Sequence, residues 1–295
     1  MTTVEDPAAP IAIPVRDEAT IARRERLRLL LGSPAFLVGA VLVGIWVLAA
    51  ILGPLLAPHD PQADDILDKL APPSGEHLFG TDRLGRDVLS RVIVGAREIL
   101  IMAPLATLLG TVVGTAIGLV TGYYRGLVDE GLMRIVDAFL AVPVIVIALL
   151  AVVALGPSRA TLILVIGFVF AMIIAKTVRA AVLGERELDY VQAARLRNER
   201  APYVMAAEIL PNVWGPVIVE FTVRLGYAIF TIATLAFLGF GADPSVPDWG
   251  TDISQHYAFI NAGVWWAVLF PSLAIATLIV GINLIADAIA QTFER

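Results

Sequence analysis

The sequence ERELDYVQAARLRNERAPYVMAAEILPN, residues 185–212, is a polar, charged interval between two long apolar stretches. It is too hydrophilic to lie inside a bilayer, because each charged side chain at the bilayer centre costs about 2.5–3.5 kcal/mol. Its alanines and arginines favour helix over irregular loop. A regular helical connection between two apolar stretches offers a surface on which another protein can act, so the interval is the main indication of function.

The rest of the chain is strongly apolar: 58% of its residues are hydrophobic and only 16% are charged, and the mean hydropathy is +0.81. A soluble domain usually has about a quarter of its residues charged. The stretches without Asp, Glu, Lys or Arg are 29–58, 99–124, 138–158, 160–175, 225–242 and 253–286. A membrane span needs about 20 mainly apolar residues, and the two shortest stretches reach this length by including flanking charges. The sequence therefore predicts an all-α membrane protein with six transmembrane helices, near 35–57, 99–122, 137–156, 161–182, 213–240 and 265–288.

These spans divide the chain into four expected parts. Residues 1–34 form a cytoplasmic tail, 35–57 the first span, 58–98 a periplasmic segment with an interfacial helix, and 99–290 a five-helix core that contains 185–212. The orientation follows from lysine and arginine, which concentrate in cytoplasmic segments. With both termini inside, 14 of the 21 basic residues lie on the cytoplasmic side. We therefore expect a multi-pass protein with both termini in the cytoplasm.

The sequence offers little for catalysis. It has no cysteine, and its three histidines are far apart in sequence, so we predict no metal site and no thiol chemistry. A phosphate-binding G-x-x-x-x-G-K-[ST] loop does not occur either. If the protein uses ATP, another chain must hydrolyse it, and this chain is expected to be non-catalytic.

Within 185–212 the residues indicate two short helices. Asp189 can cap the start of a helix over 190–197, and Asn198 suits the left-handed position that ends one. Pro202 fits a second helical start, and Pro211 ends it before the next span. The small alanines would let a partner approach closely. The alternatives are a surface helix at the lipid headgroups and a solvated loop. The candidate contact residues are Asp189, Tyr190, Gln192, Ala193, Ala194, Arg195, Arg197, Asn198 and Pro211.

Three stretches resemble one protein family. Q-A-A-x-x-x-N-x9-E-I-L-P at 192–211 resembles the EAA motif of ABC-importer permeases, E-A-A-x-x-x-G-x9-I-x-L-P. The stretch HLFGTDRLGRDVLSRVIVGAREIL at 77–100 resembles the segment before the second span of the dipeptide/oligopeptide/nickel-type permeases. TLAFLGFGADPSVPDWG at 234–250 is similar to the stretch after their fifth span. Gln192 and Asn198 stand where the family usually has Glu and Gly.

The resemblance implies the type I permease fold and a pore-forming role in the bacterial inner membrane. It implies a second permease subunit in a heterodimer, two ATP-binding subunits that hold ATP and magnesium, and an extracytoplasmic substrate-binding protein. The interval 185–212 would be the coupling helix that docks on an ATP-binding subunit. Di- or oligopeptides are the expected substrate, and nickel chelates or another small solute are the alternative. We expect contact with the lipid bilayer and none with nucleic acid.

Other candidate residues lie outside this interval. Glu220 and Arg224 are four residues apart inside the fifth span, where they either neutralise each other or line the translocation path. Asp243 and Trp249 belong to a Pro/Gly-rich loop at the expected outer face. The loop is either a connector, with Trp249 anchored at the membrane interface, or, as the family resemblance implies, an outer-gate element that makes contacts near the binding protein. Within 80–91 we expect an interfacial helix that pairs Asp87 with Arg91 before the second span. The alternative is a contact with the binding protein or with the sister permease.

Glycines in the second span predict close helix packing. Gly110, Gly114 and Gly118 recur every four residues, the pattern that lets another helix approach closely. We expect this stripe to pack within the chain or against a sister subunit.

Two other classes of protein remain as alternatives. An ion-coupled secondary transporter would need ionisable relays in several spans and helices broken at mid-membrane. A membrane-embedded enzyme would need clustered catalytic side chains. The sequence shows one charged pair inside a span and no such cluster.

Overall fold

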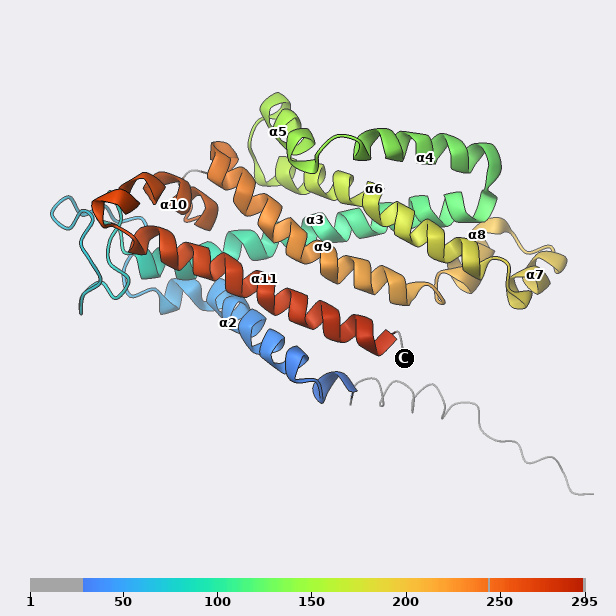
Figure 1. The fold of residues 1–295 in the computed structure, drawn as a ribbon, viewed down its shortest axis with the longest axis horizontal. Coiled ribbons are helices and arrows are strands. Elements are labelled where there is room, and N and C mark those ends of the chain that lie inside the picture. Colours follow the sequence, from blue (N-terminus) through green and yellow to red (C-terminus); the bar gives the residue numbers. More distant parts are fainter. Residues whose placement is uncertain (1–28, 244, 294–295) are drawn as a thin grey trace, which may run out of the picture.

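Long helices that run side by side form most of the protein, in a computed structural model that describes residues 29–243 and 245–293 (Figure 1). Most of the expected tail, residues 1–28, lies outside the described residues. The long helices are α2 (Pro34–Leu56), α3 (Val88–Tyr124), α4 (Gly126–Leu140), α5 (Val144–Leu155), α6 (Arg159–Glu185), α9 (Trp214–Leu235) and α11 (Trp266–Phe293). The short ones are α7 (Asp189–Leu196), α8 (Ala201–Tyr203), α10 (Trp249–His256), the π-helical turns η1 (Val204–Ile209) and η2 (Ala236–Phe240), and the 3-10 turn η3 (Tyr257–Ala262).

Five of these helices are long and apolar enough to cross a membrane, and a bent pair makes a sixth candidate span. The all-α membrane fold is therefore confirmed. The expected single helix over 137–156 is wrong: α4 and α5 meet at an angle of 86°. Pro143 explains the break, because it has no N–H to donate and disfavours helical backbone in the residue before it.

The fourth span tolerates two cations because they reach acids on α4. Lys176 donates to Asp137 Oδ1 at 2.7 Å, and Arg179 donates to Asp129 Oδ2 at 2.6 Å. These pairs attach α4 to α6, so charge inside the apolar stretch is compensated within the chain.

The glycine stripe packs against α6, and α3 and α6 share the most extensive helix contact among the described elements. A Cβ atom added to Gly114 would lie 2.6 Å from the Ala171 carbonyl oxygen, and one on Gly118 would lie 2.7 Å from Val178 Cβ. Gly122 extends the stripe by one more turn. Packing within the chain is thus confirmed, and any side chain here would push the two helices apart.

The connections gather at two opposite ends of the bundle (Figure 1). One end carries α7 and α8, and the other carries α10 together with the loop between α2 and α3. Since α6 leads directly into α7, the close α3–α6 pair connects the two ends.

The stretch 80–91 does not form the expected interfacial helix. Residues up to Asp87 form turns, and α3 then continues without interruption from Val88 to Tyr124. Asp87 caps this helix, so the expected pair with Arg91 is wrong. Arg91 instead donates from Nε to Asp252 Oδ1 of α10 at 3.1 Å and from Nη1 to the Pro61 carbonyl at 3.0 Å. The charges of this stretch therefore hold α3, α10 and the preceding loop together.

Gly85 is needed for the turn in this stretch. Its φ of +81° lies in the left-handed region, and an added Cβ would lie only 1.7 Å from the Asp65 carbonyl oxygen. Asp82 completes the turn by accepting from the Leu84 N–H at 2.7 Å and the Arg86 N–H at 3.0 Å. The turn thus fits only a residue without a side chain.

Gly85→Ala should lower the stability of the detergent-solubilised protein by more than about 1 kcal/mol, because a left-handed alanine is strained and meets Asp65. Thermal unfolding measures the loss. Gly75→Ala is the matched control, since a Cβ at Gly75 meets nothing within 4 Å. Equal melting temperatures for the two variants would contradict the assigned role of Gly85.

Candidate coupling site

The polar interval forms two short helices at one end of the bundle, as its residues predict. Asn198 has a φ of +56° just after α7, which confirms the predicted left-handed corner. Pro202 lies in the first turn of α8, and the chain turns at Pro211 before α9. The expected cap is wrong: Leu188 is the residue that precedes α7, and Asp189 lies in its first turn without a capping hydrogen bond. In the first turn of α7, the Asp189 carboxylate still interacts favourably with the positive end of the helix dipole.

One face of α7 packs into the protein core. Val191 and Ala194 are both 0% exposed and belong to the same apolar cluster as Val204 and Ile209 of η1. The prediction that both alanines form an approachable patch is therefore wrong for Ala194, while Ala193 is exposed. The helical period explains the difference, because neighbouring residues point about 100° apart.

The other face is open to solvent. Leu196 is 85% exposed, an unusual position for leucine on a charged helix. Tyr203 on α8 is also exposed. Sequence reasoning missed both residues, although Leu196 stands out as a leucine between two arginines. We call the following exposed residues the docking face: Asp189, Ala193, Leu196, Arg197, Arg200 and Tyr203. It combines apolar side chains with two arginines, a composition that is common at protein interfaces.

Two arginines hold α7 against the end of α3. Arg186 donates to the Tyr123 carbonyl at 2.7 Å, and the Arg195 guanidinium lies 4.8 Å from the centre of the Tyr123 ring. Arg186 thereby satisfies a carbonyl in the last turn of α3. Gln192 donates from its amide to the Arg186 carbonyl at 3.2 Å. The glutamine that stands in place of glutamate therefore has a structural partner that a carboxylate could not serve.

Tyr190 ties the start of the loop to its end. Its hydroxyl donates to Glu185 Oε1 at 2.6 Å and accepts from the Asn212 amide at 3.0 Å. Burial, together with the hydrogen bond to Glu185, raises the pKa of Tyr190 well above its usual value. The phenol is therefore neutral and keeps donating at every physiological pH.

Glu220 and Arg224 form the predicted pair on α9. Arg224 Nε donates to Glu220 Oε2 at 2.9 Å, and Thr177 of α6 donates to Glu220 Oε1 at 2.9 Å. The Glu220 and Arg224 side chains are 14% and 18% exposed, so each is only partly covered by this chain. The geometry is compatible with both structural neutralisation and contact with a passing solute.

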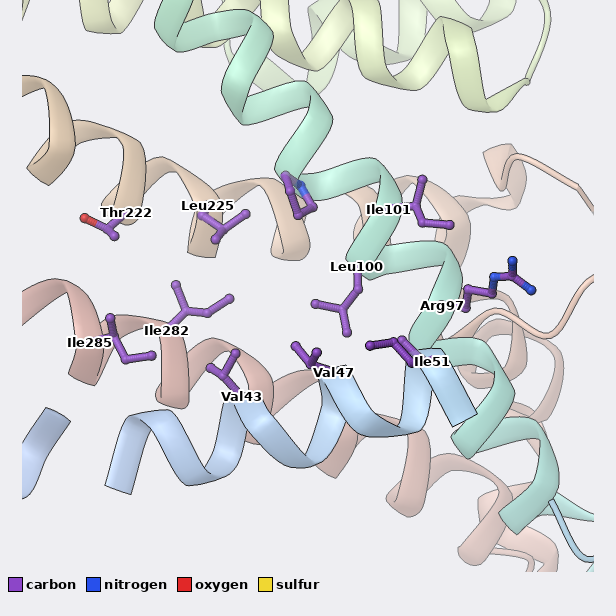
Figure 2. A pocket seen from close by; sticks show the side chains of 12 residues that line it. Val43, Val47, Ile51, Arg97, Leu100, Ile101, Thr222, Leu225, Ile282 and Ile285 are labelled. Atoms are coloured by element: carbon purple, nitrogen blue, oxygen red, sulfur yellow. The ribbon is translucent and has the colours of Figure 1, made fainter. Parts of the chain in front are cut away.

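An apolar cavity of about 630 Å³ lies elsewhere in the bundle, between α2, α3, α9 and α11 (Figure 2). Val43, Val47, Leu100 and Ile282 converge on it, and the Arg97 side chain points away from them. Thr222 and Leu225 line the cavity from α9, but Glu220 and Arg224 do not. Apart from Arg97 and Thr222 the lining is apolar, so the cavity mainly suits apolar groups.

At the end of the bundle opposite α7, Trp249 lies in the core rather than at the surface. It is 1% exposed, donates from Nε1 to the Val92 carbonyl at 2.9 Å, and packs edge-on against Trp46 at 4.9 Å between ring centres. The expected outer-face contact through Trp249 is therefore wrong. Asp243 is exposed and accepts from the Ser245 N–H at 2.9 Å.

Comparison with known proteins agrees with these features. Residues 114–295 match the sequence family described as "Binding-protein-dependent transport system inner membrane component", and residues 23–73 match "N-terminal TM domain of oligopeptide transport permease C". The chain is 40% identical over 264 residues to the dipeptide transport system permease protein of Escherichia coli K12, covering 87% of each chain. It is 34% identical over 287 residues to the corresponding protein of Alkalihalophilus pseudofirmus, covering 97% of this chain and 94% of that protein.

Gln192→Glu should loosen α7, because a carboxylate cannot donate to the Arg186 carbonyl and repels it. The loss of this hydrogen bond is worth about 1 kcal/mol and should speed amide exchange in residues 187–198. Asn198→Gly is the control, since glycine adopts the same φ and should leave exchange nearly unchanged. Unchanged exchange in Gln192→Glu would show that the amide does not hold the loop.

Proposed function

The chain belongs to the family of binding-protein-dependent transport system inner membrane components, and we propose that it is one pore-forming subunit of an ATP-driven peptide importer. As a member of this family it is a multi-pass inner-membrane permease that works with a binding protein and an ATPase, and it is itself non-catalytic. The chain's similarity to dipeptide permeases supports di- or oligopeptides as the substrate. The secondary transporter and the membrane enzyme are not supported by this family.

The complete assembly would contain a second permease subunit, two ATP-binding subunits and an extracytoplasmic substrate-binding protein. ATP and magnesium would lie in the ATP-binding subunits. The proposed orientation places both termini and the interval 185–212 in the cytoplasm and the loop 58–87 outside. In the chain path, α2 runs away from the α7 end and α11 returns toward it, so the start of α2 and the end of α11 lie on the same side, which supports this orientation (Figure 1).

The observation that carries the proposal is the docking face on a helix anchored to the core. A partner that binds Ala193, Leu196 and Tyr203 would push on α7, whose other face is buried and whose arginines are held by the end of α3. Closure of the ATP-binding subunits would thus move α6 and α3 and switch access to the pore. Asp243 remains a proposed contact for the binding protein at the other end.

Reconstitution tests the function as a whole. The chain, its partner permease, the ATP-binding subunits and the binding protein should together import a labelled dipeptide into vesicles only when ATP is supplied. Uptake of a nickel chelate in place of the dipeptide would leave the permease role intact and overturn the peptide substrate. Uptake without ATP would contradict the whole proposal.

Leu196→Asp should leave the protein folded and reduce both ATPase co-purification and ATP-driven uptake at least tenfold. A side chain that anchors an interface contributes about 2 kcal/mol to the binding free energy. Since about 1.4 kcal/mol corresponds to a tenfold change in affinity, its loss should weaken binding at least tenfold. Leu67→Asp is the matched control, because Leu67 is 94% exposed in the loop at the opposite end. Ala194→Asp should instead prevent folding, since it buries an unpaired charge. Normal uptake by Leu196→Asp would contradict the proposal that an ATP-binding subunit binds the docking face.

We also propose that Glu220 and Arg224 line the translocation path. Arg224→Met leaves a carboxylate without its cation inside a span, so it should lower both thermal stability and uptake. The double variant Glu220→Gln/Arg224→Met removes both charges and should restore stability while uptake stays low. Recovery of uptake along with stability would show that the pair only neutralises itself.

A further inference from the structure

Two of the three histidines meet an aspartate at the end of the bundle opposite the coupling site. The rings of His59 and His77 have centres 4.7 Å apart, and one ligand atom from each of His59, His77 and Asp87 lies within 4.8 Å of the others. The residues come from three places: just after α2, within the following loop, and immediately before α3. His59 and His77 are therefore neighbours in the fold, although they are far apart in sequence.

Asp87 presents one oxygen to both imidazoles. Its Oδ2 accepts from the Ser90 N–H at 2.8 Å and from the Ser90 hydroxyl at 2.6 Å. Its Oδ1 lies 2.9 Å from His77 Nδ1 and 3.7 Å from His59 Nδ1. One oxygen is thus fixed by the helix cap, and the other is directed at the two ring nitrogens, as in carboxylates that are oriented by a second partner at metal sites.

Both histidines are positioned through the backbone. The His59 N–H donates to Ser90 Oγ at 3.1 Å, so one serine orders both His59 and Asp87. The His77 N–H donates to Ser74 Oγ at 3.1 Å, and the Ser74 N–H donates to the His77 carbonyl at 2.8 Å. The rings can therefore turn about their side-chain bonds while their backbones stay in place.

His59 Nδ1 points to a ligand. This atom is buried and has no hydrogen-bond partner among the residues that the structure describes. At 3.7 Å it is too far from Asp87 Oδ1 for a hydrogen bond. A buried nitrogen without a partner costs about 1–3 kcal/mol, and a cation between the three groups would satisfy it.

We propose that His59, His77 and Asp87 bind a divalent transition ion of the zinc type. Zinc takes imidazole nitrogen and carboxylate oxygen at about 2.0–2.2 Å in tetrahedral geometry, which separates ligand atoms by about 3.3 Å. The observed separations of 2.9 and 3.7 Å from Asp87 Oδ1 lie on either side of this value. The three ligand atoms lie within 4.8 Å of one another, so the ligands would close by up to about 1.5 Å around the ion.

A cavity of about 410 Å³ is lined by His59 together with Pro58, Asp60 and Val94, so it adjoins the cluster. A bound ion would tie the loop between α2 and α3 to the first turn of α3, and both must stay in place for Arg91 to reach Pro61 and Asp252. A bound ion would therefore stabilise this end of the bundle. The proposed ion site does not depend on the proposed transport function.

Zinc binding to the complete transporter in nanodiscs tests the proposal. We expect one zinc ion per copy of this chain at the cluster, and cobalt in its place should give the absorption of a tetrahedral nitrogen–oxygen site. His59→Gln, His77→Gln and Asp87→Asn should each weaken zinc binding at least tenfold. Asp87→Asn keeps an oxygen for the Ser90 cap, so it removes the charge with little change in the helix start.

A nearby acid provides a matched control. Glu76→Gln alters an exposed residue next to His77 and should leave zinc affinity unchanged. Zinc should also raise the melting temperature of the native protein but not of His59→Gln, whose partly exposed ring can be replaced without loss of the fold. Equal zinc affinity in His59→Gln and the native protein, or an equal thermal shift in both, would overturn the proposal.

Discussion

The close approach of α3 and α6 is the constraint on which the rest of the structure depends. Glycines every four residues let the two backbones meet, and a single Cβ at Gly114 would already collide with the Ala171 carbonyl. Helices packed this closely cannot slide independently, because interiors at crystal-like density transmit displacement rather than absorb it. The two helices therefore form one closely packed pair, in which α3 extends from the α10 end to the α7 end and α6 begins beside α5 (Figure 1).

The proposed coupling site is attached to this helix pair. α6 continues into the loop that begins α7, while Arg186 and Arg195 attach the same region to Tyr123 at the end of α3. Force on the exposed docking face would thus reach both helices together. At the far end, Arg91 connects α3 to Asp252 of α10, so a displacement that starts at one end can change the packing at the other.

Features set by local chemistry could be predicted from the sequence, whereas features set by distant partners could not. Charge-free stretches located the spans, and Asn198 marked the corner because few residues tolerate positive φ. Trp249 and Ala194 were misplaced because burial depends on neighbours that sequence spacing does not identify. Arg91 and Asp252 are 161 positions apart, so the i,i+4 spacing of charged residues could not predict their ion pair. Pro143 could have predicted the bend between α4 and α5. It was overlooked because it lies within an uninterrupted apolar stretch, which was assigned to a single span.

The central claim is that an ATP-binding subunit binds the docking face of α7. Site-specific cross-linking tests this claim most directly. The chain has no cysteine, so one introduced thiol is unique within it. In the assembled transporter, Leu196→Cys should cross-link to the ATP-binding subunit, and the yield should change when ATP is bound. Leu67→Cys at the opposite end should give no such product. Equal yields from the two positions, or none from Leu196→Cys in a transporter that still imports substrate, would contradict the account.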